Sequence, residues 1–177
     1  MTRTLNATAA SLLGFLHEGP LTGWDLVATA QQRIGDFWSL TQSQVYRELT
    51  AMAEAGLVEA GDPGPRARRP YALTDAGRAA FAEWLEGDVT EELIRFPLLL
   101  VVMFGRHVPP DRLAEVIATH RHVHAQRLAL YEKQLSEPPT GEPDPYAAAT
   151  LDFGVRYERA VLGWFDALPA VIRGANG

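Results

Sequence analysis

The chain has 177 residues, enough for one large domain or two small ones, and its 47% hydrophobic and 21% charged residues are typical of a globular protein. It has no cysteine, which excludes disulfides, thiolate-bound zinc and a cysteine nucleophile. The chain has 22 acidic and 16 basic residues, which gives a net charge of −6. Any contact with nucleic acid must therefore come from a local group of cations.

The chain begins with two predicted helices. Residues 7–17, "ATAASLLGFLH", and residues 24–34, "WDLVATAQQRI", both place apolar side chains close to helical spacing, and "EGPLTG" separates them. The first stretch has the size of a signal-peptide core, but no small-residue cleavage site follows it. Residues 96–105, "FPLLLVVMFG", fall far short of the ~20 apolar residues of a membrane-spanning helix. We therefore interpret both stretches as core and expect a cytoplasmic protein.

The third predicted helix has the clearest start. Thr41 is a suitable N-cap, Gln44 completes a capping box, and Leu40 and Val45 occupy the positions of a hydrophobic staple. An apolar stripe follows on one side and a polar face on the other. Gly56 is a suitable stop signal.

A hairpin and a fourth helix come next. Residues 57–60 and 70–73 are β-like, and "GDPGPRAR" between them contains Pro-Gly turn chemistry. Thr74 then caps a helix from Asp75 to about Glu86. Helix, helix, capped helix, hairpin, helix is the order of a winged helix-turn-helix. We therefore predict a DNA-binding domain over residues 1–87, with three arginines at the tip of its wing: Arg66, Arg68 and Arg69.

The second half is predicted to be helical. "FPLLLVVMF" favours a buried helix, and "VPPDRL" starts a helix of about 26 residues, or roughly 39 Å, that ends at Ser136. The proline-rich "SEPPTGEPDP" predicts a loop. The last helix, about residues 146–168, is apolar around most of its circumference and therefore needs a partner. The fold class is thus mostly α with a small β-hairpin wing, and residues 88–177 form a C-terminal helical dimerisation domain.

Several segments, in this order, resemble the PadR family of bacterial transcriptional regulators: "LLGFLHEGPLTGWDL", "QVYRELTAMAEAGLVEA", "RRPYALTDAGRAAF" and, more loosely, "FPLLLVVMFG" and "LDFGVRYERAVLGWFDAL". Trp24 stands where the family commonly has tyrosine. Ser43 and Gln44 stand where it usually has Gly-Ser or Gly-Thr. The resemblance implies a dimeric repressor whose winged domains bind a pseudo-palindromic operator in double-stranded DNA, with small molecules often relieving repression.

The N-terminal part of a recognition helix is the part that reaches base edges. The candidate DNA contacts on the third helix are therefore Gln42, Ser43, Gln44, Tyr46 and Arg47. Gln and Arg suit adenine and guanine, and Ser or Tyr suits a phosphate. The wing arginines suit phosphates or a narrow minor groove. The alternatives are that the capping box occupies Gln44, that Tyr46 packs on the domain, and that the arginines are merely solvated.

Two further sets of residues suggest ligands. Trp38, Trp84 and Trp164 are candidates for an aromatic effector pocket, against the alternative that the tryptophans are packed core. His120 and His124 have the helical spacing of two metal ligands. No carboxylate completes an obvious set, so a role on the surface or at the dimer seam is favoured, and neither a metal nor a cofactor is predicted.

An enzyme is the least favoured class. The sequence has no G-x-S-x-G elbow, phosphate-binding loop or H-E-x-x-H pair around which a reaction centre could form. The alternative to a DNA-binding regulator is a winged-helix module that binds proteins without sequence-specific DNA binding.

Overall fold

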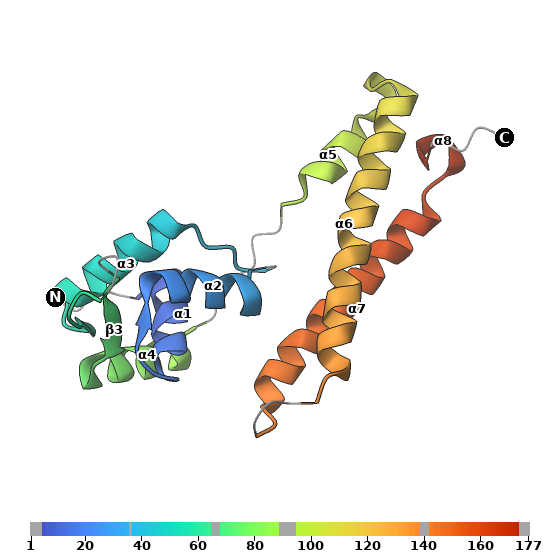
Figure 1. Ribbon diagram of the computed structural model, residues 1–177. Coiled ribbons are helices and arrows are strands. Elements are labelled where there is room, and N and C mark those ends of the chain that lie inside the picture. Colours follow the sequence, from blue (N-terminus) through green and yellow to red (C-terminus); the bar gives the residue numbers. More distant parts are fainter. Residues whose placement is uncertain (1–4, 36, 65–67, 89–94, 139–141, 174–177) are drawn as a thin grey trace. The chain divides into compact units, whose positions relative to one another are not determined.

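The computed structural model describes residues 5–35, 37–64, 68–88, 95–138 and 142–173. The chain divides into two compact units, Met1–Glu91 and Glu92–Gly177, here called the winged unit and the helical unit. Most of the chain is helical, and the strands all belong to the winged unit (Figure 1). This confirms the predicted fold class of a mostly α protein with a small β wing.

In its described residues, the winged unit contains four α-helices and a three-stranded antiparallel sheet. The helices are α1 Ala7–Leu16, α2 Gly23–Arg33, α3 Gln42–Glu54 and α4 Asp75–Glu86. The strands are β1 Leu21–Thr22, β2 Val58–Ala60 and β3 Pro70–Leu73, in the spatial order β1-β3-β2. The β2–β3 hairpin was predicted, and in the structure Glu59 lies opposite Ala72. Strand β1 was not predicted, because two residues are too few to show an alternating pattern. It is a strand because Leu21 pairs with Tyr71, which lies far along the chain.

Local signals in the sequence set the ends of these helices. Thr41 and Gln44 form the predicted capping box at the start of α3, and Thr74 caps α4 by accepting a hydrogen bond from the Gly77 amide. At the end of α3, Gly56 has a φ of 71°. The amide of Leu57 donates to the Met52 carbonyl at 2.9 Å and that of Gly56 to the Ala53 carbonyl at 3.1 Å, which is a Schellman motif.

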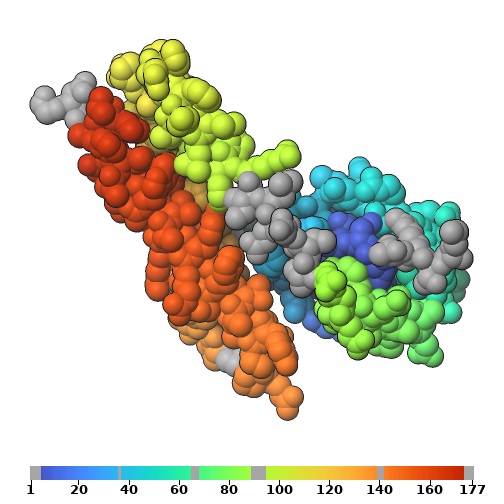
Figure 2. Space-filling model, turned by 180° about the vertical axis from the view of Figure 1, so that it is seen from behind, coloured from blue at the N-terminus to red at the C-terminus, as the bar shows by residue number. Residues whose placement is uncertain are grey.

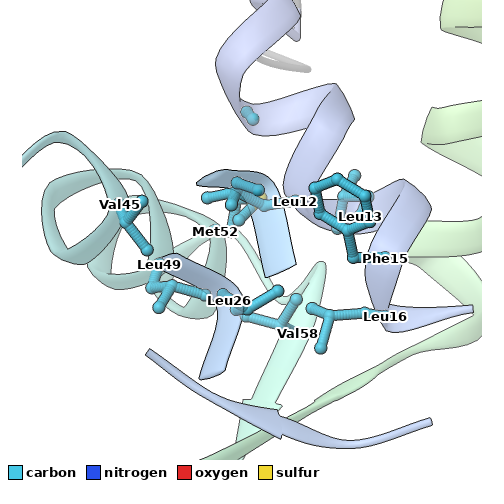
Figure 3. Packing of buried hydrophobic residues seen from close by; sticks show 11 residues of the cluster. Leu12, Leu13, Phe15, Leu16, Leu26, Val45, Leu49, Met52 and Val58 are labelled. Carbon is cyan, nitrogen blue, oxygen red and sulfur yellow. The ribbon is translucent and has the colours of Figure 1, made fainter. Parts of the chain in front are cut away.

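The core of the winged unit joins α1, α2, α3 and β2 (Figure 3). Its most deeply buried members have no exposed surface: Leu12, Leu13, Leu26, Val45 and Leu49. Val45, Leu49 and Met52 come from the predicted apolar stripe of α3, so that side of the helix is held against α1 and α2. The opposite side, including Gln42, Ser43, Arg47 and Thr50, is exposed.

The helical unit contains α5 Pro97–Met103, the short 3-10 helix η2 Gly105–His107, α6 Pro110–Ser136, α7 Pro145–Ala167 and α8 Ala170–Arg173. The two long helices, α6 and α7, pack along each other (Figure 1). A small core forms near the start of α6 and the end of α7, from Leu113, Ile117, Phe165 and Leu168. Within the described ranges, no helix combines the length and the apolar character needed to cross a membrane.

Helix α5 corrects one expectation. The sequence predicted a buried helix here. The helix is present, but none of its residues is buried, and Leu100 and Met103 are 63% and 67% exposed. In Figure 2, α5 lies on the surface of the helical unit, in yellow-green. Only one side of α5, represented by Leu98 and Val101, packs on the small core. Its apolar residues therefore exceed what a single chain can cover.

Candidate nucleic-acid interface

The first turn of α3 is the best-defined part of the candidate interface. The Thr41 hydroxyl accepts a hydrogen bond from the Gln44 amide at 3.2 Å, and the Gln44 side-chain oxygen accepts one from the Thr41 amide at 2.9 Å. The side-chain oxygen of Gln44 is thus engaged in the capping box. Gln42 and Ser43 are exposed and make no such contact with the cap. They are the residues of this turn whose side chains stand toward solvent.

Tyr46 and Arg47 follow on the second turn. A Cβ atom at Gly23 would lie 2.7 Å from the Tyr46 ring, so glycine at the start of α2 leaves the space that the ring occupies. The Tyr46 side chain packs on α2 and remains 40% exposed. The Arg47 guanidinium lies 3.5 Å from the carboxylate of the buried Glu48, and its side chain is 69% exposed. Arg47 is therefore a cation available at the surface.

The wing carries the other candidate cations. Beyond the paired strands, the amide of Gly64 donates to the Arg68 carbonyl at 2.8 Å, which continues the hairpin toward its tip. Arg68 lies over the ring of Trp24, with 5.4 Å from its guanidinium carbon to the ring centroid. Arg69 is exposed, and Arg66 lies outside the described residues.

Trp24 had not been singled out from the sequence as part of this interface. It is 51% exposed, so the alternative that the tryptophans are packed core is wrong for this one. Gly23 receives the Tyr46 ring of α3, and the next residue, Trp24, supports Arg68 of the wing. Two adjacent residues at the start of α2 thus contact both α3 and the wing. A tryptophan two residues after the helix-capping Thr22 was the available signal.

The three tryptophans proposed for an effector have different surroundings. Trp38 and Trp84, in the winged unit, are 40% and 39% exposed, and Trp84 stacks with Phe81 at 6.4 Å. Trp164, in the helical unit, lines a cavity of about 610 Å³ between α5, α6 and α7. Trp38 and Trp84 are not among the lining residues of that cavity.

His124 has a partner that the sequence did not reveal. His120 and His124 line the same cavity, and the Nδ1 atom of His124 lies 2.5 Å from a carboxylate oxygen of Glu158, which is 1% exposed. Glu158 lies on the same helical face of α7 as the buried Val155 and Phe165, and an acidic residue on that apolar face was the signal. In the part of the chain that the structure describes, no group of three metal-ligating side chains could hold an ion.

Two family models match successive parts of the chain. The model described as "Transcriptional regulator PadR-like family" matches residues 12–83. The model described as "Virulence activator alpha C-term" matches residues 94–173. The first contains α3 and the wing, and the second contains α5, α6 and α7.

Several known transcriptional regulators are similar to this chain over nearly their whole length. "Negative transcriptional regulator PadR" of Bacillus subtilis is 23% identical over 92% of this chain and 95% of the relative. Its structure with operator DNA gives a TM-score of 0.77 at 21% identity, over 94% of this chain and 99% of that one. Its structure with p-coumaric acid gives 0.68 at 21% identity, over 95% and 98%. The virulence activator AphA of Vibrio cholerae gives 0.71 at 22% identity, over 95% and 96%.

Proposed function

The chain belongs to the PadR-like family of transcriptional regulators, and we propose that it is a repressor that binds a pseudo-palindromic operator as a homodimer and is released by a small apolar or aromatic effector. As a member of this family, it is a DNA-binding transcription regulator and not an enzyme. The negative regulator of Bacillus subtilis supports repression. The cytoplasm, where DNA is accessible, is the compartment we propose.

One observation carries the DNA-binding part of this proposal: Gly23 and Trp24 hold residues of α3 and of the wing beside the same turn. We assign base reading to Gln42 and Arg47, with Ser43 and Tyr46 on phosphates, because the start of a recognition helix reaches the base edges. Gln44 contributes mainly by fixing that first turn. Arg66, Arg68 and Arg69 supply affinity that tolerates changes of DNA sequence.

The test is to measure operator and random-DNA affinity against salt concentration for Arg47→Ala and Arg68→Ala. Arg68→Ala should weaken both DNAs and reduce the salt slope by about 1. Arg47→Ala should cost about 1–3 kcal/mol on the operator and much less on random DNA. Arg112→Ala, an exposed arginine of the helical unit, is the control and should change neither. Equal losses on both DNAs for Arg47→Ala would remove its base-reading role.

The dimer is proposed from the surface of the helical unit. Leu100, Met103 and Phe104 are 57–67% exposed in one chain, more apolar surface than a helix normally leaves in water. A second copy would cover it, and a two-fold dimer would set the recognition helices about 34–36 Å apart.

Sedimentation of Leu100→Glu tests this arrangement, because a charge at an exposed position leaves the single chain intact but opposes the interface. The variant should be monomeric at micromolar concentration and bind the operator weakly. Leu85→Glu places the same change on an exposed leucine of α4 and should remain dimeric. A monomeric unaltered chain would refute the dimer.

A further inference from the structure

An acidic residue is buried on the core side of α3. The apolar stripe of this helix runs through Val45, Leu49 and Met52, and Glu48, which is 3% exposed, lies on the same side. Taking a carboxylate out of water is costly unless it meets a cation or hydrogen-bond donors. An apolar side chain at this position would fill the core without that cost. The burial of Glu48 therefore indicates a role beyond packing.

A cation beside this carboxylate is Arg47, to which we assign base reading. One Glu48 oxygen lies 3.5 Å from a guanidinium nitrogen of Arg47, whose side chain is 69% exposed. An ion pair with so exposed a partner contributes little to the stability of a fold. The distance also exceeds the roughly 2.7–3.2 Å of a normal N–H···O hydrogen bond. Glu48 therefore attracts the guanidinium, and this contact leaves the guanidinium donors available to DNA.

Other side chains at the start of α3 are also held by local contacts. The side-chain oxygen of Gln44 is engaged with Thr41 in the capping box, and the Tyr46 ring occupies the space that Gly23 leaves. A side chain that is fixed before binding loses less conformational entropy when it meets DNA. Arginine has many rotamers, so Arg47 has more to gain from such restraint than a shorter residue would.

We propose that Glu48 is the positioning residue for Arg47: its buried carboxylate keeps the guanidinium close to α3, with the N–H groups directed at one base edge. The base that fits this fork is guanine, whose O6 and N7 atoms accept two hydrogen bonds. Without Glu48, the guanidinium would turn to phosphates, whose charge attracts it at any DNA sequence. The inference rests on the base-reading part of the proposed function and adds the residue that makes the reading selective.

The test uses Glu48→Gln, which removes the charge at nearly the same volume, in the full-length protein. The DNA is the site that the unaltered protein selects from a random pool. Fluorescence anisotropy gives the affinity for this site, for random DNA, and for sites with each other base at the position whose preference Arg47→Ala abolishes.

Glu48→Gln should lower the discrimination at that position about 5-fold, since a bidentate contact discriminates by roughly 5- to 150-fold in full. Preference at the position read by Gln42 should not change. Affinity for random DNA should not fall, and its salt slope should steepen by about 1 as Arg47 moves to a phosphate. A merely structural role for Glu48 would instead weaken binding to every DNA.

Two controls isolate the pair. Glu54→Gln makes the same change at an exposed position of α3 and should leave every base preference as it is. In an Arg47→Ala background, Glu48→Gln should have no further effect on base preference. If circular dichroism shows that Glu48→Gln does not fold, Glu48→Asp, which withdraws the carboxylate by one methylene, decides in its place.

Undiminished discrimination, or equal losses on all DNAs, would overturn positioning by Glu48 and leave base reading by Arg47 standing. If Arg47→Ala itself loses no base preference, the base-reading proposal fails and the positioning role fails with it.

Discussion

The contact between Gly23 and Tyr46 can be tested by Gly23→Ala. The added Cβ would lie 2.7 Å from the ring, so the ring must withdraw by about 1 Å to reach an ordinary carbon–carbon distance of about 3.5–4.0 Å. Tyr46 is 40% exposed and can turn into solvent. The cost should therefore stay below the roughly 1–3 kcal/mol of overpacking in a closed core, and the helix preference for alanine offsets part of it. We expect the free energy of unfolding to change by less than about 1 kcal/mol.

DNA binding should respond more strongly. If the Tyr46 hydroxyl holds a phosphate, losing that hydrogen bond to a charged group costs about 1.5–3 kcal/mol, or roughly 10- to 100-fold in operator affinity. Fluorescence anisotropy and urea denaturation measure the two effects separately. Gly163→Ala is the control, since its Cβ would meet nothing within 4 Å, and it should leave DNA affinity unchanged.

A double-mutant cycle completes this test. In a Tyr46→Phe background, Gly23→Ala should cause little further loss, because the hydroxyl is already absent. Wild-type affinity for Gly23→Ala would refute a DNA contact by Tyr46 in this position. Full additivity of the two changes would show that Gly23 acts on some other group.

Three other outcomes follow from the packing and the charges. Trp24→Ala should weaken binding to operator and random DNA alike, and it should add little to Arg68→Ala, because the ring acts by supporting that side chain; additive losses would contradict this. Leu49→Ala, at a position with no exposed surface, should lower the urea-unfolding free energy by about 2–5 kcal/mol; a loss below about 1 kcal/mol would contradict the core. The hydrogen bond from Arg121 lowers the pKa of Asp166, so this pair stabilises the fold above about pH 4 and ceases to do so as the pH falls through the lowered value. Asp166→Asn should remove that acid-side dependence in a circular-dichroism titration, and an unchanged acid limb would contradict it.

Local features of the winged unit could be predicted from the sequence because nearby residues decide them. The capping box of Thr41 and Gln44 involves residues three apart, and the helix stop at Gly56 needs only a residue that tolerates positive φ. The pairing of β2 with β3 follows from turn chemistry between two β-like segments.

Features that depend on distant partners could not be predicted. Strand β1 exists through pairing with β3, about fifty residues later, and a two-residue pattern carries no signal of it. The buried Glu158 contacts two residues of another helix. Its position on the apolar face of α7 shows that it is unusual, but not which residues it meets. The exposure of α5 reflects the absence of a second covering surface in a single chain, which hydrophobicity alone does not report.

Selection of bound sequences from a random DNA pool by the full-length protein tests the central claim most directly. The account predicts an enriched motif of two inverted half-sites whose centres lie about one helical turn, or 10–10.5 bp, apart. The enriched bases should change when Gln42 or Arg47 is replaced by alanine. No enriched motif, or a single half-site recognised by a monomer, would contradict a dimeric regulator that reads DNA through α3.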